Sequence, residues 1–228
     1  MPWLPELFSA PELERVLEGR RLEELAAVPY FAGLLVGRLN ALSDSFAGEP
    51  ELHDPVRGRV RGTRAFERFA ARTHDWMAQR NVSIEDVGHI VHEQQGFEEV
   101  ILHFDGEDGR VAEPFAIVGD RRPDGQIREL RLYYGAARRP PLLQPDPELR
   151  VPDVVGEYQR ALAADGIALE PCAIVDDGHA CVLECNVAGP APQAGVAVHV
   201  RDPDGRLAAV RTYGLADRAR RAGPWTAR

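Results

Sequence analysis

Apolar positions recur first at helical spacing and then at strand spacing. Residues 30–46 and 62–79 each carry an apolar side that repeats every three to four positions, the pattern of a helix with one buried face. A further helix is predicted to about residue 26, opened by the capping-box sequence SAPE at residues 9–12. Four strands are predicted where apolar and polar residues alternate, over residues 82–93, 97–105, 111–120 and 127–134. This order predicts an α+β fold in which an antiparallel sheet curls over helices.

The second half of the chain repeats part of this pattern. After a proline-rich stretch, one amphipathic helix at residues 154–164 precedes four alternating segments, at residues 167–175, 179–187, 194–201 and 207–213. The sequence RPDGQI at residues 122–127 returns as DPDGRL at residues 202–207, which indicates an internal duplication. We therefore expect an N-terminal helical arm, a first domain, a linker, a shortened second repeat and a tail, at residues 1–27, 28–137, 138–152, 153–216 and 217–228.

Composition narrows the classes of function. A net charge of -9 and a pI near 5.3 argue against a nucleic-acid partner, because phosphate contacts need clustered cations. No apolar run approaches the ~20 residues that a membrane span needs, so we expect a cytoplasmic protein. All 27 Lys and Arg positions are arginine, which excludes Schiff-base chemistry, pyridoxal phosphate attachment and a P-loop.

Neither a metal site nor a disulfide framework is expected. The three cysteines, Cys172, Cys181 and Cys185, are odd in number and form no CxxC pair. His89 and His92 lie three positions apart on a predicted strand and so face opposite sides. We expect buried, inert thiols and no cofactor.

Asp54 is the first candidate for chemistry. It precedes Pro55 in a glycine-rich turn, after a short strand predicted at residues 51–54. Proline restricts the residue before it to extended geometry, so the side chain of Asp54 should be held in one direction. A fixed carboxylate beside apolar helices suits a general base. The same residues suit an ordinary Asx-Pro turn, and the sequence leaves both interpretations open.

The surroundings of Asp54 resemble the nuclear-transport-factor-2-like superfamily, most of all its ketosteroid isomerases and SnoaL-type polyketide cyclases. The motif Asp54-Pro55-Val56 is followed by Gly62-Thr63 and a helix. Tyr30 precedes Asp54 by 24 positions (54 − 30), the spacing between oxyanion tyrosine and base in the isomerases. The resemblance implies a cystatin-like, cone-shaped curled sheet with helices around an apolar pocket. Two such copies in one chain would form a fused pseudo-dimer.

The resemblance also implies site residues. Asp54 would be the general base and Tyr30 the oxyanion donor, with His103 and Glu99 in acid/base or hydrogen-bonding roles. Its pocket positions are Phe69, Ile101, Pro114, Ala116, Leu130, Leu132 and Tyr134. Ala116 departs from the isomerase pattern, which has a protonated aspartate there, and this argues against steroid isomerisation.

The strand at residues 97–105 carries two rows whose orientation the sequence leaves open. Glu99, Ile101 and His103 alternate with Val100, Leu102 and Phe104. The family pattern turns the first row into the pocket. A sheet with one buried face would instead bury the second row and leave Glu99 and His103 in water.

Three functions follow as hypotheses. The first is an isomerase or cyclase that acts on a polyketide-like or other apolar carbonyl compound by general acid/base chemistry. The second is a non-catalytic ligand-binding or accessory protein, and the third is an epoxide hydrolase or cyclase. We expect a small apolar substrate, no nucleic-acid or membrane partner, and repeats that pack on each other, with homodimerisation as an option.

Overall fold

The computed structural model describes residues 29–92, 94–134, 141–164, 166–188 and 192–214. The predicted arm at residues 1–27 and the tail at residues 217–228 lie outside these ranges. The chain divides into two compact units, one up to Leu132 and one from Tyr133. The division falls just before the end of a strand, and each unit has its own sheet.

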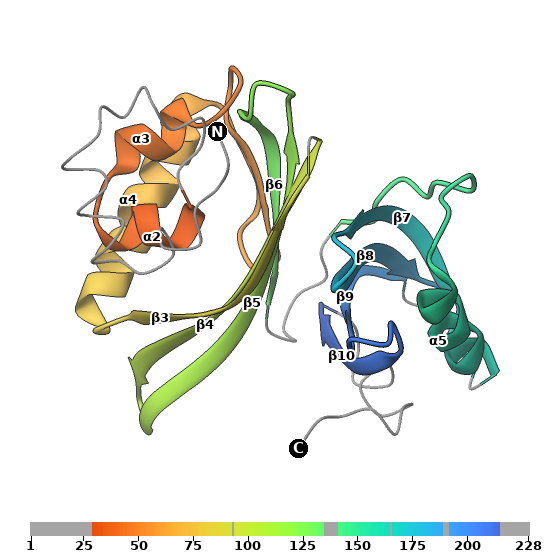
Figure 1. Ribbon diagram of the computed structural model, residues 1–228. Helices are drawn as coiled ribbons and strands as arrows, with labels where there is room; N and C mark the ends of the chain where they lie inside the picture. Colours follow the sequence, from red (N-terminus) through yellow and green to blue (C-terminus); the bar gives the residue numbers. More distant parts are fainter. Residues whose placement is uncertain (1–28, 93, 135–140, 165, 189–191, 215–228) are drawn as a thin grey trace. The chain divides into compact units, whose positions relative to one another are not determined.

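A six-stranded sheet forms the first unit, in the order β2-β1-β6-β5-β4-β3. Its strands are β1 Glu51–Asp54, β2 Gly58–Arg61, β3 Ser83–Val91, β4 Gln95–Gly106, β5 Gly109–Arg121 and β6 Ile127–Tyr134. The predicted meander is confirmed as β3 to β6. Beyond it, β1 pairs in parallel with β6 and antiparallel with β2. Figure 1 shows β4 and β5 curving beside three helices that cover one face of the sheet.

The three helices are α2 Tyr30–Leu35, α3 Leu39–Asp44 and α4 Thr63–Gln79. The single helix predicted over residues 30–46 is wrong, because Gly37 adopts a φ of +72° and ends the first segment. A methyl group at Gly37 would also lie 3.2 Å from the His74 ring. The apolar stripe predicted on α4 is buried at Phe66, Phe69, Ala70 and Met77.

Strand β2 was not predicted. The sequence GRVR at residues 58–61 is largely exposed and lacks the apolar alternation by which strands are recognised. It becomes a strand because Pro55 and Gly58 turn the chain back on β1, so that Asp54 faces Gly58 in the register. Gly58 has a φ of +80°, a conformation that suits glycine in tight turns.

The second unit contains α5 Asp153–Ala164 and a four-stranded antiparallel sheet of order β10-β9-β8-β7. The strands are β7 Leu169–Asp176, β8 Ala180–Val187, β9 Gln193–Arg201 and β10 Leu207–Tyr213. All five elements agree with the predicted pattern. They repeat the meander of β3 to β6 in the same order, without a counterpart of the β1–β2 hairpin among the described residues.

The two matching sequence motifs form the same turn. In the first, the amide of Gly125 donates to the carbonyl of Arg122 at 2.9 Å. In the second, the amide of Gly205 donates to the carbonyl of Asp202 at the same distance. Both glycines have positive φ, +89° and +78°. The turns support the internal match, while the duplication and the pseudo-dimer remain predictions.

Each unit buries its own apolar core. Leu34, Leu52 and Phe66 are fully buried in the first unit, and Val155, Cys181 and Leu183 in the second. Curved strands covered by helices on one face give the α+β fold that the sequence predicts. The helices in the described part of the chain are too short or too polar to cross a membrane.

Candidate functional site

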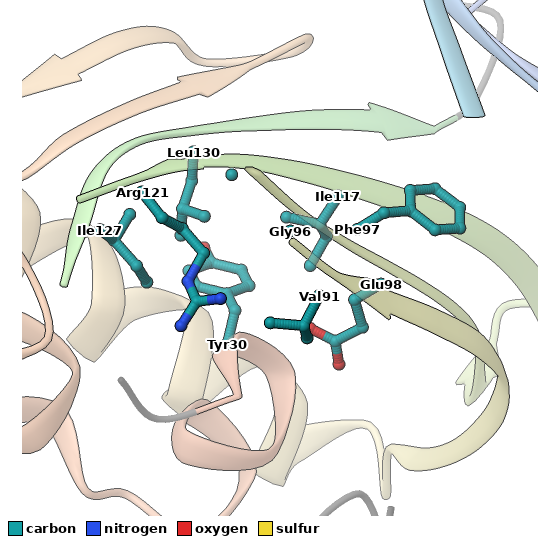
Figure 2. Close-up of a pocket in the computed structure, with 10 residues that line it drawn as sticks. Tyr30, Val91, Gly96, Phe97, Glu98, Ile117, Arg121, Ile127 and Leu130 are labelled. Carbon is teal, nitrogen blue, oxygen red and sulfur yellow. The ribbon is translucent and has the colours of Figure 1, made fainter. Parts of the chain in front are cut away.

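A cavity opens in the first unit between the sheet and the start of α2. It has about 460 Å³ of space not filled by atoms, a figure that includes the part open to solvent. Its walls are mostly apolar and come from α2 and from β3 to β6: Tyr30, Val91, Gly96, Phe97, Glu98, Ile117, Gly119, Arg121, Ile127 and Leu130. Figure 2 shows Glu98 and Arg121 projecting from the strands toward the side on which Tyr30 lies.

Glu98 is the acidic group in this wall. It lies in the middle of β4 with only 8% of its surface exposed. Burial, helped by the negative charge of Asp86, raises the pKa of Glu98 from 4.5 to about 8, although a hydrogen bond from the backbone amide of Tyr30 opposes both effects. Because a buried carboxylate without a cation is costly, the neutral acid is the stable form at pH 7.

Tyr30 and Arg121 supply the other polar groups. Tyr30 begins α2 directly after the extended residue Pro29, and its ring packs edge-on against Phe31 at 5.1 Å. Arg121 ends β5, and its guanidinium donates to the backbone carbonyls of His92 at 3.2 Å and Gly125 at 3.3 Å. Desolvation lowers the pKa of Arg121, but the group stays cationic at any physiological pH.

The row of β4 that faces the helices is the one carrying Glu98. The ring of Phe104 packs edge-on against Trp76 of α4, with ring centres 5.1 Å apart, and Glu98 accepts a hydrogen bond from the backbone amide of Tyr30, the first residue of α2. Strand alternation puts Val100 and Leu102 on the same face. Glu99, Ile101 and His103 therefore face the other way, and the prediction that they point into the pocket is wrong in orientation.

The row of Glu99, Ile101 and His103, which faces away from the helices, makes contacts with β3 and β5. The Nε2 atom of His103 lies 2.7 Å from a carboxylate oxygen of Glu85, an exposed pair on the face away from the helices. In the register, Ala116 is opposite Glu99, and Pro114 is opposite Ile101. Direct cross-strand partners share a face, so Pro114 and Ala116 also turn away from the cavity.

The remaining predicted pocket residues lie on the helix-facing side. Leu130 lines the cavity. Leu132 and Tyr134 follow it at every second position of β6, so all three side chains are on the same face of the strand. Phe69 is buried on α4 beneath the guanidinium of Arg57, 5.1 Å from the ring centre. Of all the predicted site residues, only Tyr30 and Leu130 are among the residues that line the cavity.

Asp54 serves the β1–β2 turn. It is 5% exposed, and its Oδ1 atom accepts hydrogen bonds from the backbone amides of Val56 at 2.8 Å and Arg57 at 2.7 Å. This is the Asx turn that the sequence offered as the alternative to a general base. The residue is not among those that line the cavity, and a catalytic role for it remains an untested prediction.

Substitution of Asp54 separates these two roles. Because two backbone amides donate to one carboxylate oxygen, Asp54→Ala is expected to destabilise the chain by about 1–2 kcal/mol. Asp54→Asn keeps a side-chain acceptor and should lose less than half as much. Urea unfolding followed by circular dichroism measures both. A loss for Asn equal to that for Ala would contradict the turn assignment.

A second polar cluster lies on β1 and β6. Oxygen and nitrogen atoms of Glu51, His53 and Glu129 lie within 4.8 Å of one another, a spacing that a metal ion could use. Both carboxylates already accept hydrogen bonds from arginine side chains. Arg59 donates to Glu51 at 2.6 Å, and Arg131 donates to Glu129 at 3.0 Å. The cluster is an ion-pair network, and the expectation of no metal stays a prediction.

Searches with the sequence and with the fold gave different results. No protein-family model matches the sequence, and no curated protein matches it. Among solved structures, the chain is similar to the epoxide hydrolase/cyclase-like enzyme SalBIII of pyran ring formation in the polyether salinomycin. That likeness has 18% identity, covers 46% of this chain and 84% of that one, and has a TM-score of 0.39.

Two further structures each resemble about half of the chain. One is an NTF2-like protein of unknown function from Cytophaga hutchinsonii, with 15% identity over 46% of this chain and 93% of that one, at a TM-score of 0.40. The other is a putative polyketide cyclase from Sinorhizobium meliloti, with 18% identity, 50% and 99% coverage and a TM-score of 0.36. Likenesses of this size leave the activity to be argued from the chain's own residues.

Proposed function

We propose that the first unit, with its nuclear-transport-factor-2-like fold, is a small-molecule enzyme that moves protons on an apolar carbonyl compound beside Glu98. The observation that carries the proposal is a buried carboxyl group in the wall of an apolar cavity, with its pKa raised to about 8. A general acid or base works best when its pKa lies near the working pH. Glu98 takes the role that the sequence had suggested for Asp54.

The proposed step is an enolisation. The carboxylate form of Glu98 takes a proton from the carbon next to the carbonyl; the electron pair of that C–H bond forms a C=C bond, and the π pair of the carbonyl moves to its oxygen. Neutral Glu98 then returns the proton. Return to the same carbon is proton exchange, and return to a conjugated carbon is an isomerisation. The positive charge of Arg121 and the phenol of Tyr30 would favour the enolate oxygen in a cavity of low dielectric.

Arg121 also favours a second candidate, epoxide opening. Arg121 lies in the cavity wall with Glu98, so an acid and a cation line the same cavity. Neutral Glu98 would donate its proton to the epoxide oxygen as the C–O bond breaks; water would add to the carbon and give up a proton to the Glu98 carboxylate, which yields the diol. A non-catalytic binding protein would use the same cavity without either reaction.

Hydrogen exchange at the carbon next to a ketone tests the proposal without knowledge of the natural substrate. The full chain is incubated in D₂O with cyclohexanone or 1-tetralone, and loss of the proton signal is followed by NMR. We expect exchange above the buffer rate, rising with pH up to about 8 as Glu98 ionises. Glu98→Gln should reduce the enzymatic rate at least 100-fold, since general base catalysis contributes roughly that much or more.

Glu99→Gln is the matched control, because Glu99 is the next residue on the same strand and faces away from the cavity. It should exchange at nearly the wild-type rate. Equal rates for wild type and Glu98→Gln would refute the proposal. Conversion of cyclohexene oxide to its diol, lost in Glu98→Gln, would support the second candidate instead.

A further inference from the structure

Two glycines face each other on the sheet side of the cavity. Gly96 of β4 and Gly119 of β5 are direct partners in the register, and both line the cavity. Neither is among the glycines with positive φ in the described part of the chain, so the backbone conformation does not demand glycine at either position. Glycine in a strand weakens the strand and often marks a place where a ligand approaches the backbone closely.

Two cavity side chains lie close to the positions that a Cβ atom would take at these glycines. A Cβ atom at Gly96 would lie 3.4 Å from Cδ of Arg121, and a Cβ atom at Gly119 would lie 3.0 Å from Cδ2 of Leu130. Arg121 and Leu130 therefore lie close over the two glycines, and both are cavity residues themselves. A methyl group at Gly119 would push Leu130 away from the sheet and toward the cavity, whereas one at Gly96 would fill the space beside Arg121 with an ordinary contact.

We infer that the Gly96–Gly119 pair sets the depth of the cavity and so determines the largest apolar ketone that it accepts. The inference rests on the proposed function only in that the cavity binds the ligand. A pocket rejects a ligand that is one methylene too large by roughly 10- to 200-fold, so two added methyl groups should change the size preference measurably. Glu98 would remain in place, because a Cβ atom at either glycine would have no atom of Glu98 within 4 Å.

The test compares ketones of two sizes on three versions of the full chain. Dissociation constants for cyclohexanone and 1-tetralone are measured by ligand-detected NMR on the wild type, the double variant Gly96→Ala/Gly119→Ala, and Gly88→Ala. The control residue Gly88 lies on β3, outside the cavity lining, and has no positive φ. A Cβ atom at Gly88 would meet no other atom within 4 Å. Circular dichroism confirms that each variant folds.

We expect the double variant to bind 1-tetralone at least 10-fold more weakly, with cyclohexanone changed less than threefold, and Gly88→Ala to match the wild type. Equal weakening of both ketones, unchanged binding of 1-tetralone, or a wild type that binds neither ketone would each overturn the inference. If the double variant does not fold, the test uses the single variant Gly96→Ala, whose added methyl makes only an ordinary contact. This variant should bind 1-tetralone at least threefold more weakly, with a smaller change for cyclohexanone.

The readout is binding, so it is separate from catalysis. Suppose that the wild type binds both ketones and the double variant loses affinity for 1-tetralone as expected, but the wild type does not exchange the ketones' protons. This result would refute the proposed enzyme and leave the inference about the Gly96–Gly119 pair intact. Exchange in the wild type without size discrimination in the double variant would do the reverse.

Discussion

Replacement of Glu98 by glutamine is expected to stabilise the first unit at pH 8. In the folded chain the pKa of Glu98 is raised from 4.5 to about 8. Between these two values the unfolded chain has lost the proton and the folded chain has kept it, so stability falls as pH rises through this window. The full loss is roughly 5 kcal/mol, at 1.36 kcal/mol for each pKa unit, and glutamine cannot ionise.

The difference between Glu98→Gln and wild type should therefore be small at pH 4.5 and several kcal/mol in favour of the variant at pH 8.5. Urea unfolding at the two pH values, followed by hydrogen exchange in peptides from β4 and β5, measures it within the first unit. Glu99→Gln provides the control for the change of charge on the same strand. A constant difference at all pH values would contradict the account.

Acid should destabilise the second unit through His199. This residue of β9 is fully buried, its ring packs edge-on against Tyr158 of α5 at 5.3 Å, and its Nδ1 lies 3.2 Å from the carbonyl oxygen of Cys181. Nε2 has no hydrogen-bond partner among the described residues. Burial lowers the pKa of His199 from 6.5 to about 4, because a proton would place a charge in a core of low dielectric.

The sign of the effect is opposite to that of Glu98. Between pH 6.5 and 4 the unfolded chain binds a proton that the folded chain refuses, so stability falls as pH falls, by roughly 3 kcal/mol. His199→Phe, which keeps a ring beside Tyr158, should remove this part of the pH dependence. Hydrogen exchange of peptides from β8 and β9 between pH 7 and pH 4.5 tests it. Equal slopes in wild type and variant would show that His199 does not carry the effect.

Periodicity was enough to predict most of the fold. Strands β3 to β10 and helices α4 and α5 were found because their apolar residues repeat at strand or helix spacing over seven or more positions. The errors have local causes. Gly37 breaks a helix through its positive φ, and β2 is too polar and too exposed to be recognised.

The candidate site depended on one choice that periodicity cannot make. Alternation along β4 separates its residues into two rows but does not say which row meets the helices. The row of Val100, Leu102 and Phe104 meets the helices, but Glu99 on the other row is buried as well, so burial alone does not identify the row that faces the helices. Extending that row by one step would have reached Glu98 from the sequence alone.

Asp54 illustrates the limit of motif matching. Its spacing to Tyr30 and its proline neighbour fit both a base and a turn, and only the hydrogen bonds from Val56 and Arg57 distinguish a turn. Arg121 had no local signal either, because its place in the cavity wall depends on the space that Gly96 of the neighbouring strand leaves beside it. The positions of such side chains relative to a cavity depend on tertiary packing, which cannot be predicted from a local sequence pattern.

The most direct test is the titration of Glu98 itself. Protein labelled with ¹³C at the glutamate side-chain carboxyl is followed by NMR from pH 4 to pH 10, and the Glu98 signal is identified by its absence in Glu98→Gln. The account predicts a midpoint near pH 8. A midpoint near 4.5, the ordinary value for glutamate, would mean that the Glu98 carboxylate is solvated and already ionised at pH 7. This result would contradict the account.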